Sequence, residues 1–195
     1  MENIVQEAAP KYNFISPKEY LEMERASDDK HEYFDGQVYA MSGASLKHNK
    51  VVMNLTSILH RFLEGKDCTV LAENMRVSSP SHDSYLYPDV LIYCNKEELE
   101  DDQFDTLLNP SVIFEILSPS TRSIDKGRKL FYYKEITSLQ EYFMVDTAKR
   151  LIHVVRKVPN GSWNFENISE SDSFVFIQTI NYQLLLSDIY KGTGI

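Results

Sequence analysis

Hydrophobic residues recur at helical spacing in three parts of the chain. Apolar side chains at steps of three and four between Ser45 and Glu64 predict one long helix that ends near Gly65. A shorter helix is expected to begin at Ser16-Pro17-Lys18-Glu19, where Ser16 can cap the first turn and Glu19 can return the bond. The segment 122–136 predicts a third helix.

Short apolar and β-branched runs between turn residues predict the strands. Asp35-Gly36 is typical of a hairpin turn that joins 31–35 to 37–41. The polar segment 79–85 and the acidic segment 95–109 are expected to be surface loops. Further strands are expected over 69–78, 87–94, 111–117, 141–146, 151–157, 163–168 and 174–179, before a last apolar piece over 184–190.

The order of elements from residue 45 is helix, strand, strand, strand, helix, strand. Helices on a mixed sheet make an α/β or α+β domain. A length of 195 residues suits one domain with a sizeable core. We therefore expect a single domain over 1–195, with its core at about 45–146 and an N-terminal helix and hairpin.

The strand over 111–117 contains one charged residue, Glu115. Period-two alternation places Glu115 on the same face as Ile113 and Leu117, and both faces of this strand are apolar. An unpaired buried carboxylate costs on the order of several kcal/mol. Glu115 therefore needs a proton, a basic side chain or a metal ion as its partner.

A second carboxylate, Asp89, follows Pro88 at the entry of the preceding strand. If the two strands pair, Asp89 and Glu115 converge at one end of the sheet. Two hard oxygen ligands suit Mg²⁺ or Mn²⁺, which can polarise a phosphodiester and activate water. The alternatives are a Pro-Asp turn for Asp89 and a buried ion pair for Glu115. The two carboxylates together favour a metal.

The third predicted helix is basic. Lys129 shares a helical face with Asp125 and Tyr133, and we expect it to reach the carboxylates, where it would orient a water or stabilise phosphate charge. Arg122 and Lys126 are candidates for contacts with flanking phosphates. The alternative is a solvated helix with an Asp125–Lys129 ion pair.

Three more side chains are candidates for the same site. His48 lies near the start of the long helix on its apolar face; such a histidine is more often a hydrogen-bonded core residue, but it becomes a ligand candidate if that helix end faces the carboxylates. Glu32 and Glu73 are further inward candidates, although exposed strand charges explain both equally well.

The overall charge limits the class of function. A net charge of −9 argues against coating nucleic acid by charge alone and leaves room for a local basic face. Cys68 and Cys94 match no zinc spacing, and we expect reduced thiols in a cytoplasmic protein. No apolar run reaches the roughly 18 residues that a membrane span needs, so no membrane partner is expected.

Taken together, these motifs resemble a known family. "YPDVLIY" (87–93), "VIFEILSPST" (112–121), the helical set Asp125, Lys129 and Tyr133, and "EYFMVD" (141–146) look like the Uma-two (Uma2) family of restriction endonucleases in the PD-(D/E)XK nuclease superfamily. "HEYFDGQVYAM" (31–41) followed by His48 looks like that family's N-terminal motif. The likeness extends over about 16–190.

The resemblance implies a restriction-endonuclease-like core, a central mixed sheet flanked by helices. It implies Asp89 and Glu115 as the ligands of Mg²⁺ (or Mn²⁺), with a contribution from His48 or Glu32. The superfamily's lysine stands two residues after the glutamate, where this chain has Leu117, and Lys129 is its match here. We expect a DNA endonuclease, with a homodimer completing the DNA-binding face.

Two other functions are compatible with the sequence. A catalytically silent nuclease-fold protein that binds nucleic acid or a protein partner is favoured by the net charge and by Leu117. A hydrolase of small phosphate esters is less favoured, because the chain has no nucleotide-binding loop.

Overall fold

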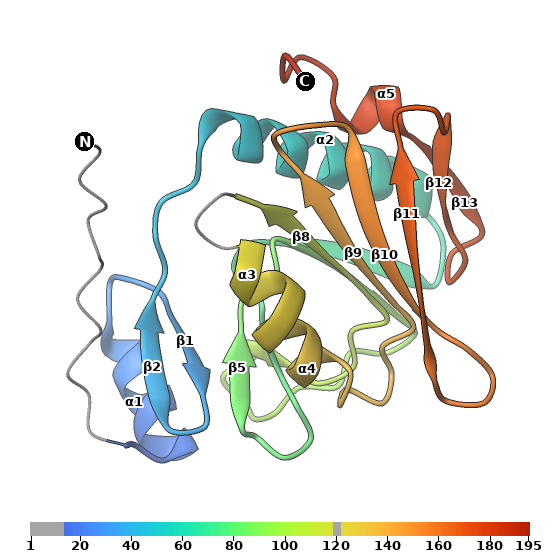
Figure 1. Cartoon of the computed structure of the whole chain (residues 1–195). Coiled ribbons are helices and arrows are strands. Elements are labelled where there is room, and N and C mark those ends of the chain that lie inside the picture. Colours follow the sequence, from blue (N-terminus) through green and yellow to red (C-terminus); the bar gives the residue numbers. More distant parts are fainter. Residues whose placement is uncertain (1–13, 119–121) are drawn as a thin grey trace, which may run out of the picture.

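The computed structural model describes residues 14–118 and 122–195. Its largest element is a six-stranded mixed sheet in the order β11-β10-β9-β8-β6-β3, in which only the β8–β9 pair is parallel (Figure 1). The strands are β3 (Cys68–Ala72), β6 (Val90–Cys94), β8 (Val112–Leu117), β9 (Glu141–Asp146), β10 (Leu151–Lys157) and β11 (Trp163–Ser169).

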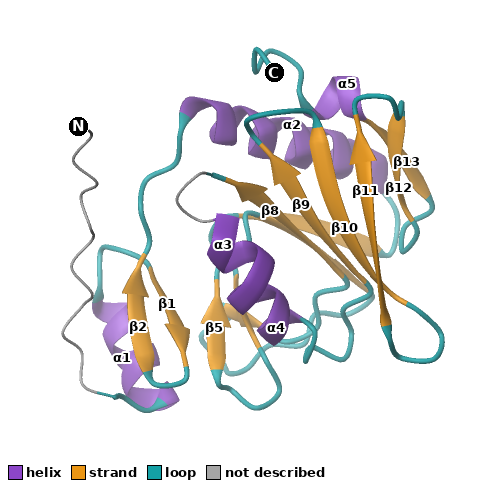
Figure 2. Ribbon diagram, viewed as in Figure 1, coloured by secondary structure: helices purple, strands orange, loops and turns teal. Residues whose placement is uncertain are grey.

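Helices cover both faces of this sheet. The predicted long helix is α2 (Leu46–Leu63), which is capped by Ser45. Its apolar side packs on Phe114 and on the other β8 residues that share this face of the sheet. The basic helix packs on the opposite face, against Ile113 and Leu117. The alternation predicted for 112–117 is therefore confirmed, and so is the mixed sheet flanked by helices (Figure 2).

A second sheet lies beside the first, in the order β2-β1-β5-β4-β7. Its strands are β1 (His31–Phe34), β2 (Gln37–Ala40), β4 (Arg76–Ser78), β5 (Ser84–Leu86) and β7 (Thr106–Leu107). The predicted hairpin is confirmed, with Asp35 and Gly36 at φ 45° and 82° in its turn. A third, two-stranded sheet pairs β12 (Phe174–Ile177) with β13 (Tyr182–Leu185), followed by α5 (Leu186–Ile189).

Three sequence predictions of elements are wrong. The strand expected over 69–78 is two strands in different sheets, because Glu73 adopts φ 60° and breaks the ladder between them. The segments 79–85 and 95–109 are not only loops, since they contain part of β5 and all of β7, where Thr106 and Leu107 are buried.

The prediction of two reduced thiols is also wrong. Cys68 and Cys94 form a disulfide. They lie directly opposite each other in the β3–β6 ladder, a proximity that their separation of 26 residues conceals in the sequence.

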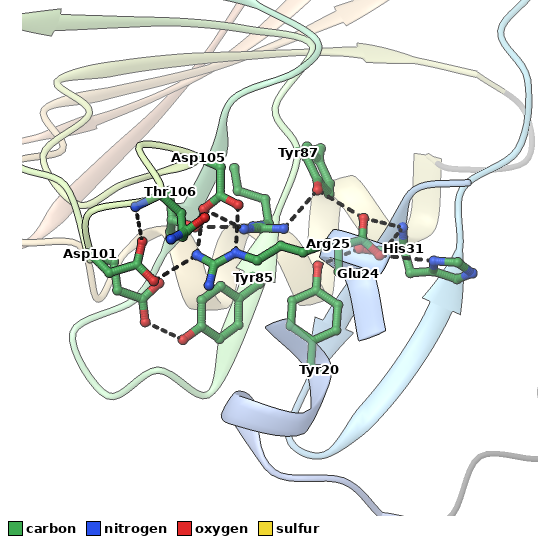
Figure 3. A network of polar contacts seen from close by, with 12 residues as sticks. Tyr20, Glu24, Arg25, His31, Tyr85, Tyr87, Asp101, Asp105 and Thr106 are labelled. Atoms are coloured by element: carbon green, nitrogen blue, oxygen red, sulfur yellow. Dashed lines mark hydrogen bonds and ion pairs between the residues drawn. The ribbon is translucent and has the colours of Figure 1, made fainter. Parts of the chain in front are cut away.

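The N-terminal helix α1 (Pro17–Ala26) has the predicted capping box at Ser16 and is held by a polar network (Figure 3). The Glu24 carboxylate accepts hydrogen bonds from the Tyr87 hydroxyl at 2.9 Å and from a backbone N–H of β1. Arg25 pairs with Asp105 at 2.8 Å, and Arg76 pairs with the same carboxylate at 2.7 Å. These contacts tie α1 to the second sheet.

Among the described residues, no helix is both long and apolar enough to cross a membrane.

Candidate active site

Asp89 and Glu115 meet at one end of the six-stranded sheet. Val90 lies opposite Phe114 in the antiparallel β6–β8 ladder, so the same register continued by one residue sets Asp89 opposite Glu115. The Asp89 Oδ2 atom accepts the backbone N–H of Ile116 at 2.6 Å. The convergence expected from strand pairing is therefore present, and Glu115 is buried with 2% of its surface exposed.

The Lys129 ammonium lies among three carboxylates from three different elements. Its Nζ is 2.7 Å from Oε1 of Glu32 on β1, 3.1 Å from Oε1 of Glu115 on β8, and 3.7 Å from Oδ1 of Asp125. Only 6% of Lys129 is exposed. The lysine thus reaches the sheet end from the following helix, as expected, and brings the N-terminal hairpin to the site through Glu32.

The basic helix is built in three parts. Arg122–Ile124 is α3, Asp125–Lys129 is a π-helical turn, and Leu130–Tyr133 is α4. The Tyr133 hydroxyl donates to Glu115 Oε1 at 2.7 Å, and the Tyr142 hydroxyl from β9 donates to the Asp125 carbonyl at 3.0 Å. The predicted shared face of this helix is therefore the face that packs on the candidate site.

Negative charge exceeds positive charge at this buried position. Burial raises the pKa of Glu115 well above its usual range; Lys129 offsets part of this effect, while Asp89, Asp125 and Glu32 add to it. Burial lowers the pKa of Lys129, but the surrounding carboxylates outweigh burial and leave it well above the usual value. The surrounding carboxylates therefore favour the ammonium form of Lys129.

His48 and Glu73 differ in their placement. The N-terminal turn of α2 faces the carboxylates, and His48 Nε2 is 3.2 Å from Asp89 Oδ1. Burial lowers the pKa of His48, but its hydrogen bond to Asp89 and the charge of that group raise it above the usual value. Glu73 is exposed, which agrees with the alternative of an exposed charge and not with an inward placement, and its charge helps to raise the pKa of His48.

The two expected phosphate-binding side chains lie on the same helix but have protein partners. Arg122 pairs with the buried carboxylate of Asp146 at 2.9 Å. Lys126 Nζ is 2.7 Å from His153 Nε2 on β10. Asp146 and His153 belong to the surroundings of the site. Asp146 ends the EYFMVD motif, but the sequence did not indicate its contact with Arg122, and it did not indicate His153, because β9 and β10 reach the helix only through the pairing of the sheet.

The donor set fits a divalent cation by its chemistry. In the described part of the chain no three His, Cys, Asp or Glu side chains are arranged as a ready metal cluster, and Lys129 occupies the centre of the three nearest carboxylates. Hard carboxylate oxygens in excess over one ammonium are nevertheless the ligands that Mg²⁺ and Mn²⁺ prefer. Asp89 and Glu115 are the residues that would hold such an ion.

The mixed sheet is covered by helices on both faces and has a lysine among carboxylates at one strand end, and this architecture is that of an α+β protein. A solved structure described as a putative nuclease belonging to DUF820, from Anabaena variabilis, matches with a TM-score of 0.75 and 18% identity, over 92% of this chain and 99% of that chain. The chain belongs to the Uma2 family, described as "Putative restriction endonuclease", whose model matches residues 17–186.

Two relatives from Synechocystis are similar over most of their length. The uncharacterized protein slr1290 is 33% identical over 178 residues, which is 91% of this chain and 92% of that protein. The uncharacterized protein sll1609 is 30% identical over 149 residues, or 76% of this chain and 84% of that protein.

Proposed function

We propose that this chain is a divalent-metal-dependent endonuclease that hydrolyses phosphodiester bonds in DNA. The observation that carries the proposal is the buried Lys129 ammonium, held 3.1 Å from Glu115 at the sheet end where Asp89 also lies. Family membership and fold support a restriction-type nuclease as the class.

In this proposal Asp89 and Glu115 hold Mg²⁺ or Mn²⁺, and His48 or Glu32 adds a ligand or orients one. The ion, when bound, polarises the phosphodiester and lowers the pKa of a water molecule. His48 already hydrogen-bonds Asp89, and Glu32 already contacts Lys129, so each is in place to orient a ligand.

Lys129 acts as a cation in this scheme. Because its pKa is raised, it holds its proton and does not serve as a general base. An ammonium fixed by three carboxylates can orient the attacking water and stabilise the charge that develops on the phosphate oxygens. Arg122 and Lys126, in the two helical turns before Lys129, would release their protein partners and bind flanking phosphates, and a homodimer would extend this basic face.

Plasmid nicking in Mg²⁺ or Mn²⁺ tests this function. We expect wild type to nick supercoiled plasmid and Asp89→Asn and Glu115→Gln to lose at least about a hundredfold in rate, the size of effect typical of removed electrostatic stabilisation. Glu98→Gln, which changes an exposed carboxylate in the acidic segment, is the matched control and should cut like wild type. Equal rates in all four proteins would exclude the site.

A second function is favoured by one observation. Lys129 fills the centre of the carboxylates, and the described residues contain no ready cluster of three metal ligands. In a protein of nuclease fold that binds nucleic acid without cutting it, Lys129 would keep this position and no metal ion would bind to the carboxylates. Binding of DNA at wild-type strength in every variant, with no nicking in either metal, would support this second function.

A further inference from the structure

One face of the large sheet continues beyond the basic helix. Strand pairing sets Glu115 opposite Met144, Met144 opposite His153, and His153 opposite Asn167. This row crosses β8, β9, β10 and β11 on the face that carries the basic helix (Figure 1). At about 4.8 Å per strand, Asn167 lies roughly 14 Å from the candidate active site.

The far end of this face presents an exposed aromatic ring. Phe165 on β11 is 59% exposed, although large aromatic side chains are usually buried. Trp163 lies two residues earlier on the same face of β11 and packs at the edge of the core. Phe165 lies outside the hydrophobic core, and the ammonium groups beside it distinguish it from a merely exposed ring.

Ammonium groups surround the two rings. Lys134 Nζ, from the end of the basic helix, lies 4.7 Å from the centre of the Phe165 ring and 6.0 Å from that of Trp163. Lys157 Nζ is 6.0 Å from the Trp163 ring. We call Trp163, Phe165, Lys134 and Lys157 the β11 platform.

A hollow of about 230 Å³ joins the platform to the basic helix. Lys126, His153, Phe165 and Asn167 are among the residues that line it, and His153 contacts both Lys126 and Asn167 through its two ring nitrogens. The one carboxylate that lines it, Glu166, contacts Arg156, a guanidinium that it shares with Glu141. In a chain of net charge −9, this is a local positive surface with an aromatic face.

We propose that the β11 platform binds an unpaired nucleotide of the DNA strand on which the active site works. The base stacks on Phe165, and Lys134 and Lys157 contact the adjoining phosphates. Aromatic rings flanked by cations are the means by which proteins bind single-stranded nucleic acid without reading its sequence. This inference rests on the proposed function and extends it to DNA with a single-stranded segment.

The chain's one tryptophan makes the platform directly observable. We would titrate the protein in EDTA, which prevents cutting, with a single-stranded twelve-residue oligothymidine and with a blunt duplex of equal length. Binding is followed by anisotropy of the labelled oligonucleotide and by Trp163 fluorescence. The single strand should quench Trp163 and bind more tightly than the duplex.

Phe165→Ala should weaken binding of the single strand about tenfold, as expected for the loss of one stacked base. Phe104→Ala is the matched control, because Phe104 is 66% exposed in the acidic segment and should not matter. Binding without Trp163 quenching, equal affinity in Phe165→Ala and wild type, or no binding at all would overturn the proposal.

The two proposals fail separately. Loss of nicking in every preparation, with quenching retained and sensitive to Phe165→Ala, would remove the nuclease function and leave the platform. Nicking that depends on Glu115, with single-strand binding indifferent to Phe165, would leave the nuclease and remove the platform.

Discussion

At the scale of single residues, the glutamate in the apolar strand β8 is explained by its neighbours. Glu115 accepts hydrogen bonds from Lys129 and Tyr133 on the same oxygen, so the buried carboxyl group has polar partners. Removing one partner of a buried ion pair lowers the free energy of unfolding by roughly 3–5 kcal/mol. The fold is therefore more stable when both side chains stay in contact. Burial and the nearby carboxylates of Asp89, Asp125 and Glu32 raise the pKa of Glu115, and Lys129 offsets only part of this effect.

The sequence predicts part of this site because part of it is local. Alternation along β8 places Glu115, and the step of four in the following helix places Lys129. Glu32 is different, because it comes 83 positions before Glu115 and contacts Lys129 only through the pairing of the hairpin with β5. The sequence named Glu32 as a possible ligand but contained no signal for its contact with the lysine.

Asp105 carries a prediction of pH-dependent stability. Its hydrogen bond to Arg25, together with Arg76, holds the pKa of this carboxyl below its usual range (Figure 3). A carboxylate with a lowered pKa stabilises the fold above the unfolded value of about 3.9 and loses that effect as pH falls further. Asp105→Asn should therefore lower the free energy of unfolding by about 1–2 kcal/mol at pH 7, since a third of the side chain is exposed.

Urea denaturation between pH 7 and pH 2 measures this effect. The difference in free energy of unfolding between wild type and Asp105→Asn should become smaller as pH falls below about 4. Asp102→Asn, an exposed acid in the same segment, should follow wild type throughout. A difference in free energy of unfolding that stays constant down to pH 2 would contradict the stabilisation assigned to the Arg25–Asp105 ion pair.

At the scale of elements, the basic helix departs from a regular α-helix at the site. Its periodicity predicts an α-helical face, and the structure gives a π-helical turn over Asp125–Lys129. Such turns are frequent at functional sites, where they redirect side chains. Asp125 and Lys129 are both buried within this turn. The hydrophobic periodicity of the sequence does not distinguish a single π turn from a regular α-helical turn, because the π turn adds only one residue to one turn of the helix.

Replacing two glycines by alanine tests the backbone conformation, because the two substitutions should change stability in opposite directions. Gly127 lies inside the π turn, is exposed, and has open space where a Cβ would stand, so Gly127→Ala should stabilise the protein by about 0.5–1 kcal/mol. Gly65 follows α2 with φ +74°, and Gly65→Ala should destabilise it by about 1 kcal/mol. Thermal unfolding of both variants measures these changes in stability. Changes in the same direction in both variants would contradict the backbone conformations described for the two glycines.

The missed elements share a physical cause. β4, β5 and β7 have three, three and two residues, too few for alternation to indicate a strand. Their pairing with the hairpin is set by contacts distant in sequence, and so is the Cys68–Cys94 disulfide across β3 and β6. The longer elements α2, β8, β9 and β10 are predictable because each has its own hydrophobic pattern.

At the scale of the whole molecule, charge is unevenly distributed. The chain has a net charge of −9, yet the basic helix and the β11 platform place Arg122, Lys126, Lys134 and Lys157 along one face of the large sheet. Nucleic acid that approaches an acidic protein is restricted to such a face. The composition excluded general coating of DNA, and the sheet topology shows where a local contact is available.

We propose that Asp89 and Glu115, with Lys129 beside them, form a site for a divalent cation. Calorimetric titration with Mn²⁺ tests this claim most directly, because it requires neither DNA nor cleavage. Wild type should give saturable heat that Glu115→Gln and Asp89→Asn lose, while Glu98→Gln keeps it. Absence of heat in wild type, or equal heat in all four proteins, would contradict the claim.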